Sequence, residues 1–448
     1  MLIGNRNTEG DNTAPGDGPT KKLWRAPLAP GAIQHRMSLP GSKSLTNREL
    51  ILAALADGPG VLRSPLISRD TSLMIDALVA LGVRIEEIET GSPFGPDLHV
   101  TPATELLGST SISCGLAGTV MRFMPPVAAL ALGPTSFDGD VAARRRPMRA
   151  ILDALRTIGA DIADDGRGTL PFTVHGTGGI TGGRVEIDAS LSSQFVSGLM
   201  LAAPRFEEGI HIVHTGERLP SIPHIDMTVN VLQSRGVVVE RVAQAEWVVH
   251  PGPIKAMDVA IEPDLSNAAP FLAAAVVAGG TVAVDGWPTN TTQVGDTLRD
   301  LLQLFGAKVE LENNVLTVSG SGKFSGIKLN LSDAGELAPT IVTLAALADS
   351  PSEIKGIGHI RHHETDRLAA LVSEINKLGG DATELDDGIR IEPRKLHGGT
   401  WLSYEDHRMA TSGALLGLVV PDVVVEDVET TSKTLPQFVQ LWHEMLAK

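Results

Sequence analysis

The chain has 448 residues, of which 42% are hydrophobic and 4% aromatic, and its formal net charge is −16. This length exceeds one ordinary hydrophobic core, so we expect two or three domains built mainly from aliphatic residues. The acidic balance argues against a general nucleic-acid or anionic-membrane surface, because neutralising phosphates requires an excess of basic residues. The single cysteine, Cys114, excludes an intrachain disulfide and a cysteine-based zinc site.

The first 20 residues are rich in Gly, Asn, Thr, Pro and Asp, and this composition predicts a disordered tail over residues 1–20. These residues lack the charged-then-apolar pattern of a signal peptide. No apolar run in the chain reaches the length of a membrane span. Together with the lone cysteine, these features predict a cytoplasmic protein without membrane contact.

The first predicted functional element is the turn Ser38–Arg48, with the sequence SLPGSKSLTNR. It places small polar residues, Lys43 and a terminal arginine directly before a predicted helix over residues 49–56. Free N–H groups and the positive helix end favour an anion at such a turn. A P-loop needs glycine directly before the lysine, where Ser42 stands, so another kind of phosphate or carboxylate site is predicted. The alternative is a solvated helix cap that binds nothing.

One pattern recurs along the chain: an amphipathic helix ends at a glycine and a short strand follows. Apolar residues at i, i+3, i+4 and i+7 mark one buried face of each helix. Glycine suits the left-handed position that follows the last helical turn. The helix-ending glycines, about 70 to 80 residues apart, are Gly82, Gly159, Gly236, Gly306 and Gly379.

A second helix with little charge precedes each amphipathic helix by about half a period. A helix that is apolar all round is predicted to be buried on all sides. In the last copy, Leu435–Leu446 takes the place of the amphipathic helix. These features predict six copies of one unit, divided into two domains of three. The alternative is chance similarity among α/β segments.

Polar clusters of the first half stand at the entrances of the apolar helices. In Ser113–Arg122 (SCGLAGTVMR), Gly118 allows a ligand to approach the backbone closely. Arg144–Arg146 places three guanidinium groups where the next helix begins. Leu191–Gln194 (LSSQ) puts two hydroxyls and an amide before the most apolar helix. Each cluster also has a purely structural interpretation, as a packing turn, a solvated charged face or a helix cap.

Four clusters of the second half, DAGELAPT, HIRHHETDRL, EDHRMA and TTSKTLP, follow the same rule. Such dense charge at the entrance of apolar helices is costly unless it is paired or used. His362 and His363 are adjacent, so in a helix they face different ways, and no HExxH-type spacing suggests a metal. The combined Lys, Arg, Ser and Gln side chains fit two polyanionic small substrates, with Glu336 and Glu364 as candidates for proton transfer.

The segments LPGSKSLTNR, AGTVMR, the RP-led helix, SSQ, HETDRL, DHRMA and SKTLP resemble, in the same order, the motifs of the 5-enolpyruvylshikimate-3-phosphate synthase family. They span Leu39 to Pro436, and their combination is highly specific. The resemblance implies an α/β fold of two similar domains, each of three βαβαββ units packed around buried helices as an inside-out α/β barrel. It places the active site in the cleft between an N-terminal domain (42–261) and a discontinuous C-terminal domain (21–41 plus 262–448).

The reaction implied by the resemblance transfers the enolpyruvyl group of phosphoenolpyruvate to the 5-hydroxyl of shikimate 3-phosphate, through a tetrahedral intermediate, and releases phosphate. It implies Glu336 as the base, Glu364 as the acid and Lys43 as an assistant in either step. The implied contacts to shikimate 3-phosphate are Lys43, Ser44, Arg48, Ser192, Ser193, Gln194, Ser221, Glu336 and His363. The implied contacts to phosphoenolpyruvate are Lys43, Gly118, Arg146, Gln194, Arg367, Arg408 and Lys433. No cofactor or metal is implied, and we expect a monomer.

Five positions depart from the best-known family pattern. Glu336 stands where Asp is common, which keeps the carboxylate chemistry, and Leu116 replaces an Asn. His363 stands where Lys is common, and His359 and His224 replace Asn and Tyr. Because histidine loses its charge near neutrality, we expect shikimate 3-phosphate affinity to fall as the pH rises through about 7.

Two rival functions stay open at this point. An enolpyruvyl transferase acting on UDP-N-acetylglucosamine shares the fold, but its mobile loop uses a cysteine, and Cys114 stands elsewhere, ahead of AGT. The other rival is a non-catalytic anion-binding protein on the same scaffold, which would not need both Glu336 and Glu364. Turnover of phosphoenolpyruvate distinguishes the enzyme from the binding protein.

Overall fold

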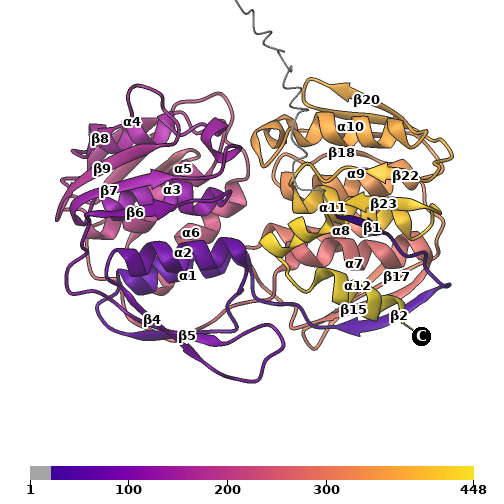
Figure 1. Cartoon of the computed structure of the whole chain (residues 1–448), viewed down its shortest axis with the longest axis horizontal. Helices are drawn as coiled ribbons and strands as arrows, with labels where there is room; N and C mark the ends of the chain where they lie inside the picture. Colours follow the sequence, from indigo (N-terminus) through magenta and orange to yellow (C-terminus); the bar gives the residue numbers. More distant parts are fainter. Residues whose placement is uncertain (1–21, 448) are drawn as a thin grey trace, which may run out of the picture.

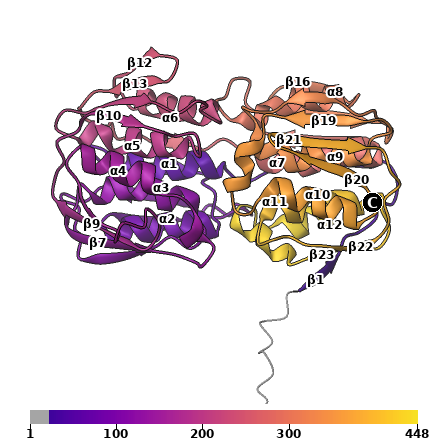
Figure 2. The ribbon, with the colours of Figure 1, turned by 90° about the horizontal axis from the view of Figure 1, so that it is seen from above.

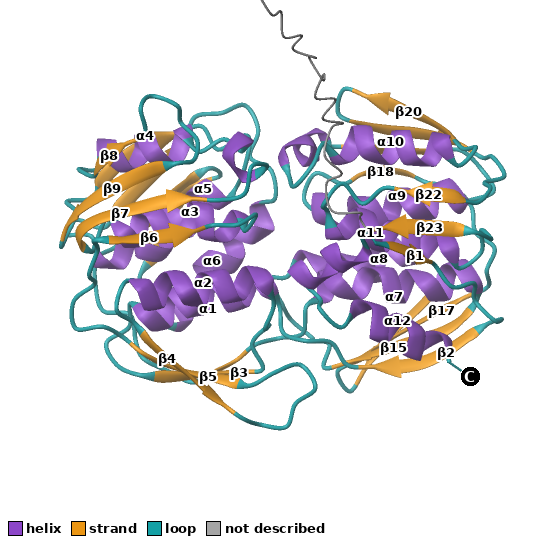
Figure 3. Ribbon diagram, in the orientation of Figure 1, coloured by secondary structure: helices purple, strands orange, loops and turns teal. Residues whose placement is uncertain are grey.

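The computed structural model describes residues 22–447, which form two lobes lying side by side (Figure 1). The tail predicted over residues 1–20 lies outside the described part. Helices fill the middle of each lobe and sheets lie around them (Figure 3). Each lobe has its own hydrophobic core, one of residues from 45 to 261, the other combining residues 26–39 with residues 265–445. The two cores support the predicted domain boundaries, which stay a proposal.

The first lobe contains three copies of one unit. Its elements are α1 (Lys43–Ala54), β3 (Gly60–Arg63), α2 (Arg69–Ala80), β4 (Arg84–Ile88), β5 (Asp97–Thr101), β6 (Thr110–Ser113), α3 (Gly118–Ala128), β7 (Leu132–Asp138), η1 (Ala143–Arg145), α4 (Arg149–Thr157), β8 (Asp161–Ala163), β9 (Phe172–Thr177), β10 (Gly183–Ile187), α5 (Gln194–Ala202), η2 (Ala203–Arg205), β11 (Ile210–His214), α6 (Ile222–Ser234), β12 (Val239–Ala243) and β13 (Glu246–Val249). Strand β6 pairs parallel with β7, and β9 joins β7 and β8 by antiparallel pairing. The resulting order β6-β7-β9-β8 repeats as β10-β11-β13-β12.

The second lobe repeats this design. Its elements are β1 (Leu23–Arg25), β2 (Ile33–Met37), α7 (Leu265–Ala278), β15 (Gly280–Asp285), η3 (Val294–Thr297), α8 (Leu298–Leu304), β16 (Lys308–Glu312), β17 (Val315–Gly320), β18 (Lys328–Asn330), η4 (Gly335–Leu337), α9 (Ala338–Leu347), β19 (Ser352–Lys355), η5 (Gly358–His362), α10 (Arg367–Lys377), β20 (Asp381–Leu385), β21 (Gly388–Glu392), β22 (Gly399–Trp401), α11 (His407–Gly417), β23 (Val423–Glu426), η6 (Val428–Lys433) and α12 (Phe438–Leu446). The sheet β18-β19-β21-β20 has the same order as in the first lobe. The last copy has three strands, β22, β23 and β1. The helix predicted over Leu435–Leu446 is present as α12, which begins three residues later, at Phe438, and ends at Leu446 as predicted.

The chain crosses between the lobes twice, and the two crossings lie together. Strand β2 precedes α1 in sequence, yet it pairs parallel with β15 of the second lobe. Conversely β14 (Val259–Ala260) precedes α7 and pairs parallel with β3 of the first lobe. A bridge joins Gly41 to Pro263 where the two crossings meet. The starts of α1 and α7 are therefore held beside one another at the junction of the two lobes. Figure 2 shows the two lobes from above, with α1 in one and α7 in the other.

The predicted distinction between apolar and amphipathic helices is confirmed. Every residue of α7 from Leu265 to Val277 is buried, as its almost uncharged sequence requires. In contrast α4 buries its apolar residues and exposes a charged face. The five predicted helix-ending glycines all have positive φ angles, from 79° to 108°, which supports their predicted role. Within residues 22–447, none of the helices is long and apolar enough to cross a bilayer.

Candidate active site

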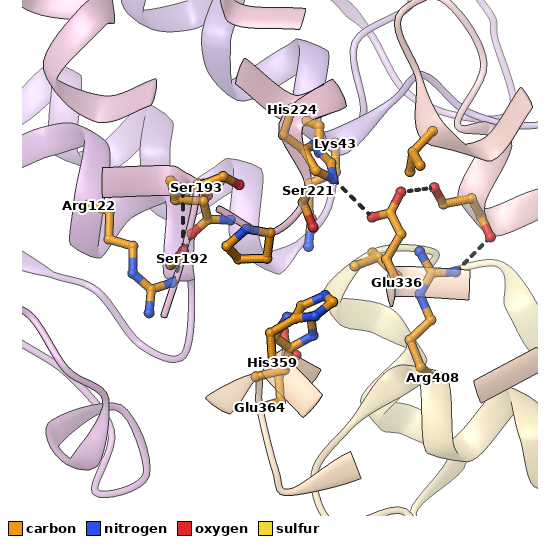
Figure 4. A pocket seen from close by; sticks show the side chains of 18 of the residues that line it. Lys43, Arg122, Ser192, Ser193, Ser221, His224, Glu336, His359, Glu364 and Arg408 are labelled. Atoms are coloured by element: carbon orange, nitrogen blue, oxygen red, sulfur yellow. Dashed lines mark hydrogen bonds and ion pairs between the residues drawn. The ribbon is translucent and has the colours of Figure 1, made fainter. Parts of the chain in front are cut away.

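A polar pocket lies between the two lobes, where several buried helices begin (Figure 4). The helices begin here because polar caps stand directly before apolar runs. Ser42, Asp264 and Asp406 each accept a hydrogen bond from a backbone N–H in the first turn of α1, α7 and α11. Helix N-termini attract negative charge, so their convergence suits an anionic ligand.

Most of the residues predicted for the site line this pocket together. They are Lys43, Ser44, Arg146, Ser192, Ser193, Gln194, Ser221, Glu336, His363, Glu364, Arg367 and Arg408. Three predicted residues, Arg48, Gly118 and Lys433, are not among the lining residues. Arg48 and Lys433 are buried beside lining residues, and their direct contact with a substrate stays a prediction.

The buried Arg122 and the half-buried Arg146, both of the first lobe, form a cation-rich end of the pocket. Arg122 Nη1 donates to Gln194 Oε1 at 2.8 Å, and Arg146 Nη1 donates to the Leu116 carbonyl at 3.1 Å. Burial, and then the nearby charge of Arg146, lower the pKa of Arg122 well below its usual value. Neither arginine is paired with a carboxylate across a short ion pair in the described residues. This end of the pocket therefore favours an anion that supplies the missing negative charge.

Arg48 joins two helices at the side of the pocket through hydrogen bonds. Its guanidinium donates to Thr228 Oγ1 at 2.8 Å, to the Ser44 carbonyl at 3.0 Å and to the His224 carbonyl at 2.9 Å. It also lies 5.2 Å from the ring centroid of Phe123. Burial lowers the pKa of Arg48 to about 9. Arg48 thus ties α1 to α6 and fixes two lining residues, Ser44 and His224.

Glu336 enters the pocket from η4 of the second lobe and meets the first lobe there. Ser266 Oγ donates to its Oε1 at 2.5 Å, and His224 Nε2 of α6 lies 3.7 Å from its Oε2. Figure 4 shows His224 on the opposite side of the pocket from η4, facing this carboxylate. Burial favours a raised pKa, but nearby His224 and Arg408 outweigh it, so the pKa of Glu336 is lowered. An ionised Glu336 is available to accept a proton.

Glu364 is held as a carboxylate by two cations. It accepts a hydrogen bond from Arg367 Nη2 at 2.9 Å and another from Lys433 Nζ. Burial opposes ionisation, yet Lys433 and then Arg367 lower the pKa of Glu364 well below its usual range. Arg367 is fixed in turn by Asp406, whose carboxylate accepts its Nε–H at 2.7 Å. The residue predicted as an acid is therefore ionised in this structure, and acid catalysis requires that its cations find other partners.

Five histidines line the pocket: His224, His359, His362, His363 and His407. Burial lowers the pKa of four of them, and Arg367 and Arg408 add to the effect at His363 and His407 respectively. The expected loss of charge by His363 near pH 7 is therefore wrong for this structure, in which the ring is already neutral. Its Nδ1 lies 3.0 Å from Arg367 Nη1, and a neutral ring can accept a hydrogen bond from that guanidinium N–H. Among the described residues no group of three or more His, Cys, Asp or Glu is placed to hold a metal ion.

We expect the melting temperature to fall as the pH is lowered from about 7 to about 5. Histidines with lowered pKa values in the folded state bind protons only at a lower pH than in the unfolded chain. Below about pH 6.5 the unfolded chain therefore binds more protons than the folded protein, and the folded state loses stability. Calorimetry of wild type, of His363→Gln and of the control His250→Gln measures the slope. His363→Gln should flatten it, whereas the His250 side chain is 44% exposed and pairs with Glu240 away from the pocket, so its replacement should not. Equal slopes in all three proteins contradict the account.

Several lining residues were given no substrate contact from the sequence. Arg122 stands in the AGTVMR segment, but only the helical turn after Gly118 shows that it faces inward. Asp264 and Ser266 open α7, the counterpart of α1 in the second lobe, so a comparison of the repeated units could have found them. Gln293 lies in a loop with no signal in the sequence, and it reaches the pocket because its amide donates to Glu262 and the Pro263 carbonyl.

Comparison with known proteins connects this geometry to one family. The sequence model of EPSP synthase (3-phosphoshikimate 1-carboxyvinyltransferase) matches residues 28–442. The chain belongs to the EPSP synthase family. A 3-phosphoshikimate 1-carboxyvinyltransferase from Kocuria rhizophila is 53% identical over 429 residues, which cover 95% of this chain and 96% of that relative. The predicted family is thereby confirmed, and the alternative that acts on UDP-N-acetylglucosamine is not favoured.

Solved EPSP synthase structures share the fold. Two structures of EPSP synthase from Acinetobacter baumannii superpose with a TM-score of 0.78, at 23% and 22% sequence identity. Each alignment covers 95% of this chain and 98% of the other. The two-lobed α/β fold predicted for this EPSP synthase family member is confirmed.

Proposed function

We propose that this member of the EPSP synthase family transfers the enolpyruvyl group of phosphoenolpyruvate to the 5-hydroxyl of shikimate 3-phosphate and releases inorganic phosphate. The observation that carries the proposal is one pocket lined by anion-binding groups of the first lobe and by Glu336 and Glu364 of the second. A binding protein needs the cations alone, whereas transfer also needs groups that move protons.

Shikimate 3-phosphate is assigned to the hydroxyl-rich side of the pocket. Ser192 and Ser193 precede α5 in the lining, and Ser221 lies directly before α6 with a left-handed backbone. These hydroxyls and the first-turn N–H groups of two helices can hold a phosphate together. The full proposed contact set is Lys43, Ser44, Arg48, Ser192, Ser193, Gln194, Ser221, Glu336 and His363.

Phosphoenolpyruvate is assigned to the arginine-rich side. Arg146 comes from the first lobe and Arg408 from the second, so a dianion between them would be neutralised from both sides. Arg408 is already fixed, because its Nη1 donates to the Ser266 carbonyl at 2.6 Å. The full proposed contact set is Lys43, Gly118, Arg146, Gln194, Arg367, Arg408 and Lys433.

The proposed chemistry is addition followed by elimination. Glu364 donates a proton to the methylene carbon of phosphoenolpyruvate, the 5-hydroxyl oxygen bonds to the adjacent carbon, and Glu336 accepts the hydroxyl proton. In the second step Glu364 takes a proton back from the methyl group, the carbon–oxygen bond to phosphate breaks, and phosphate leaves with the proton from Glu336. Lys433 can turn from Glu364 to the bound substrate while Asp406 keeps Arg367 in place, and the loss of this cation raises the proton affinity of Glu364 when an acid is needed.

We expect Gly118→Ala to weaken phosphoenolpyruvate binding by about 1–3 kcal/mol. A Cβ at this position would lie 2.9 Å from Arg122 Nη1 and 2.9 Å from Arg146 Nη2, so both guanidinium groups must move. The Michaelis constant for phosphoenolpyruvate should rise more than that for shikimate 3-phosphate. The control is Gly306→Ala, where no atom lies within 4 Å of the added carbon and only backbone strain is introduced. An unchanged constant for phosphoenolpyruvate in Gly118→Ala would remove Gly118 from the site.

Phosphate release from phosphoenolpyruvate tests the proposed function. Release should require shikimate 3-phosphate and should not occur when UDP-N-acetylglucosamine replaces it. Tight binding of both substrates without release would instead favour an anion-binding protein.

We also infer a monomer in the cytoplasm. Both halves of the pocket come from one chain, so no second copy is needed to complete it. The lone Cys114 is buried and unpaired, which fits a reducing compartment. Sedimentation at micromolar concentration tests the oligomeric state.

A further inference from the structure

Asp70 is a buried carboxylate that no hydrogen bond satisfies. It is the second residue of α2, its residue exposure is 1%, and neither carboxylate oxygen accepts a hydrogen bond from any described residue. Its one ion-pair partner among those residues is Lys43, whose Nζ lies 3.6 Å from Asp70 Oδ2. Buried carboxylates are normally both paired with a cation and hydrogen-bonded. A buried carboxylate without hydrogen bonds therefore requires an explanation.

The start of α2 does not need Asp70. Thr71 Oγ1 accepts the backbone N–H of Ser68 at 2.8 Å, and the two hydroxyls lie 3.3 Å apart, so Ser68 and Thr71 close the helix end. The neighbouring Arg69 turns to Asp140, which accepts its Nη2–H at 2.5 Å. A neutral side chain would be easier to bury at position 70, and capping therefore does not account for the carboxylate.

The side chain of Lys43 is held less firmly than its backbone. Its backbone N–H is fixed by Asp264 at 3.0 Å, whereas its flexible side chain reaches into the pocket and is 21% exposed. The pocket also contains Glu336, a competing carboxylate that Lys43 influences electrostatically. An ammonium group carries three donors. If one is directed toward Asp70, the other two are directed into the pocket.

We propose that Asp70 is a positioning residue that holds the Lys43 ammonium away from Glu336 and directs its remaining donors at the substrates. The inference rests on the proposed function, which assigns Lys43 to both substrates. It differs from that function because Asp70 does not line the pocket and acts only through Lys43.

Kinetics of Asp70→Asn test the proposal. The turnover number should fall by about 10–100-fold, since a small displacement of an aligned group costs this much, and the Michaelis constants should change less. Asp70→Glu should restore part of the loss. In the Lys43→Met variant, adding Asp70→Asn should cause no further loss of turnover, because Asp70 acts only through the ammonium group that this variant lacks. The control is Asp97→Asn, a buried carboxylate that accepts the Ser64 N–H at 2.8 Å away from the pocket.

Melting temperatures give a readout that needs no activity. Lys43→Met leaves Asp70 as an unpaired buried charge, so adding Asp70→Asn should raise the melting temperature of that variant, although it should not raise that of wild type. Equal losses of turnover from Asp70→Asn in both backgrounds, or equal shifts in melting temperature, would overturn the proposal. Absence of turnover in wild type would reject the proposed function instead, and the melting cycle would still decide whether the pair exists.

Discussion

Glu364→Gln is expected to lower turnover by about 10²–10⁴ while both substrates still bind. Glutamine keeps the size of the side chain, and its one amide oxygen can accept a hydrogen bond from Arg367 or from Lys433, which donate to different oxygens of Glu364. It cannot deliver a carboxyl proton to the methylene carbon. Turnover is measured by phosphate release, and binding by titration calorimetry with each substrate.

The matched control for this variant is Glu353→Gln. Glu353 lies on β19, where its Oε2 accepts two hydrogen bonds from Arg390, and it is not among the pocket-lining residues. Its replacement should leave turnover near that of wild type. Near-normal turnover in Glu364→Gln would assign the proton to another group, and weak binding with normal turnover at saturation would make Glu364 a binding residue.

Arg235→Met is expected to reduce the free energy of unfolding by about 3–5 kcal/mol. Arg235 directly follows α6 and is fully buried, and its Nε and Nη2 donate to Glu49 Oε2 at 2.9 and 2.7 Å. Glu49 lies on α1, so the pair joins the helix that carries Lys43 to α6. Without Arg235, a buried carboxylate is left unpaired. Urea denaturation of both proteins measures the difference.

The double variant Arg235→Met with Glu49→Leu separates the cost of an unpaired charge from lost packing. Removing both partners should recover most of the stability. Burial already raises the pKa of Glu49, so the unpaired carboxyl is tolerated in its protonated form, and the loss in Arg235→Met should shrink as the pH falls. A loss below about 1 kcal/mol in Arg235→Met would mean that the pair behaves like a surface one.

Local patterns predicted much of this fold. The five helix-ending glycines take the left-handed backbone that their position after an amphipathic helix requires. The apolar helices such as α7 are buried all round, as their lack of charge requires. Most of the predicted pocket residues also meet. They do so because each stands at a helix entrance and the six units bring those entrances together.

What the sequence did not predict depends on the surroundings of each group. No pattern around His363 shows that burial and Arg367 keep it neutral, because both come from tertiary packing. Similarly, Arg48 reads as a free cation, yet its donors serve Thr228, Ser44 and His224. The ionised state of Glu364 also depends on Lys433, which is distant in sequence. Charge states and ligand-facing donors require the contacts themselves.

The identity of the product tests the central proposal most directly. The protein is incubated with phosphoenolpyruvate labelled with carbon-13 at the methylene carbon and with shikimate 3-phosphate, and the mixture is followed by carbon and phosphorus NMR. We predict that one inorganic phosphate appears for each phosphoenolpyruvate consumed, that the shikimate phosphate ester persists, and that the label stays in a vinyl methylene group of an enol ether at the 5-oxygen. Labelled pyruvate as the product, or unchanged substrates, would contradict it.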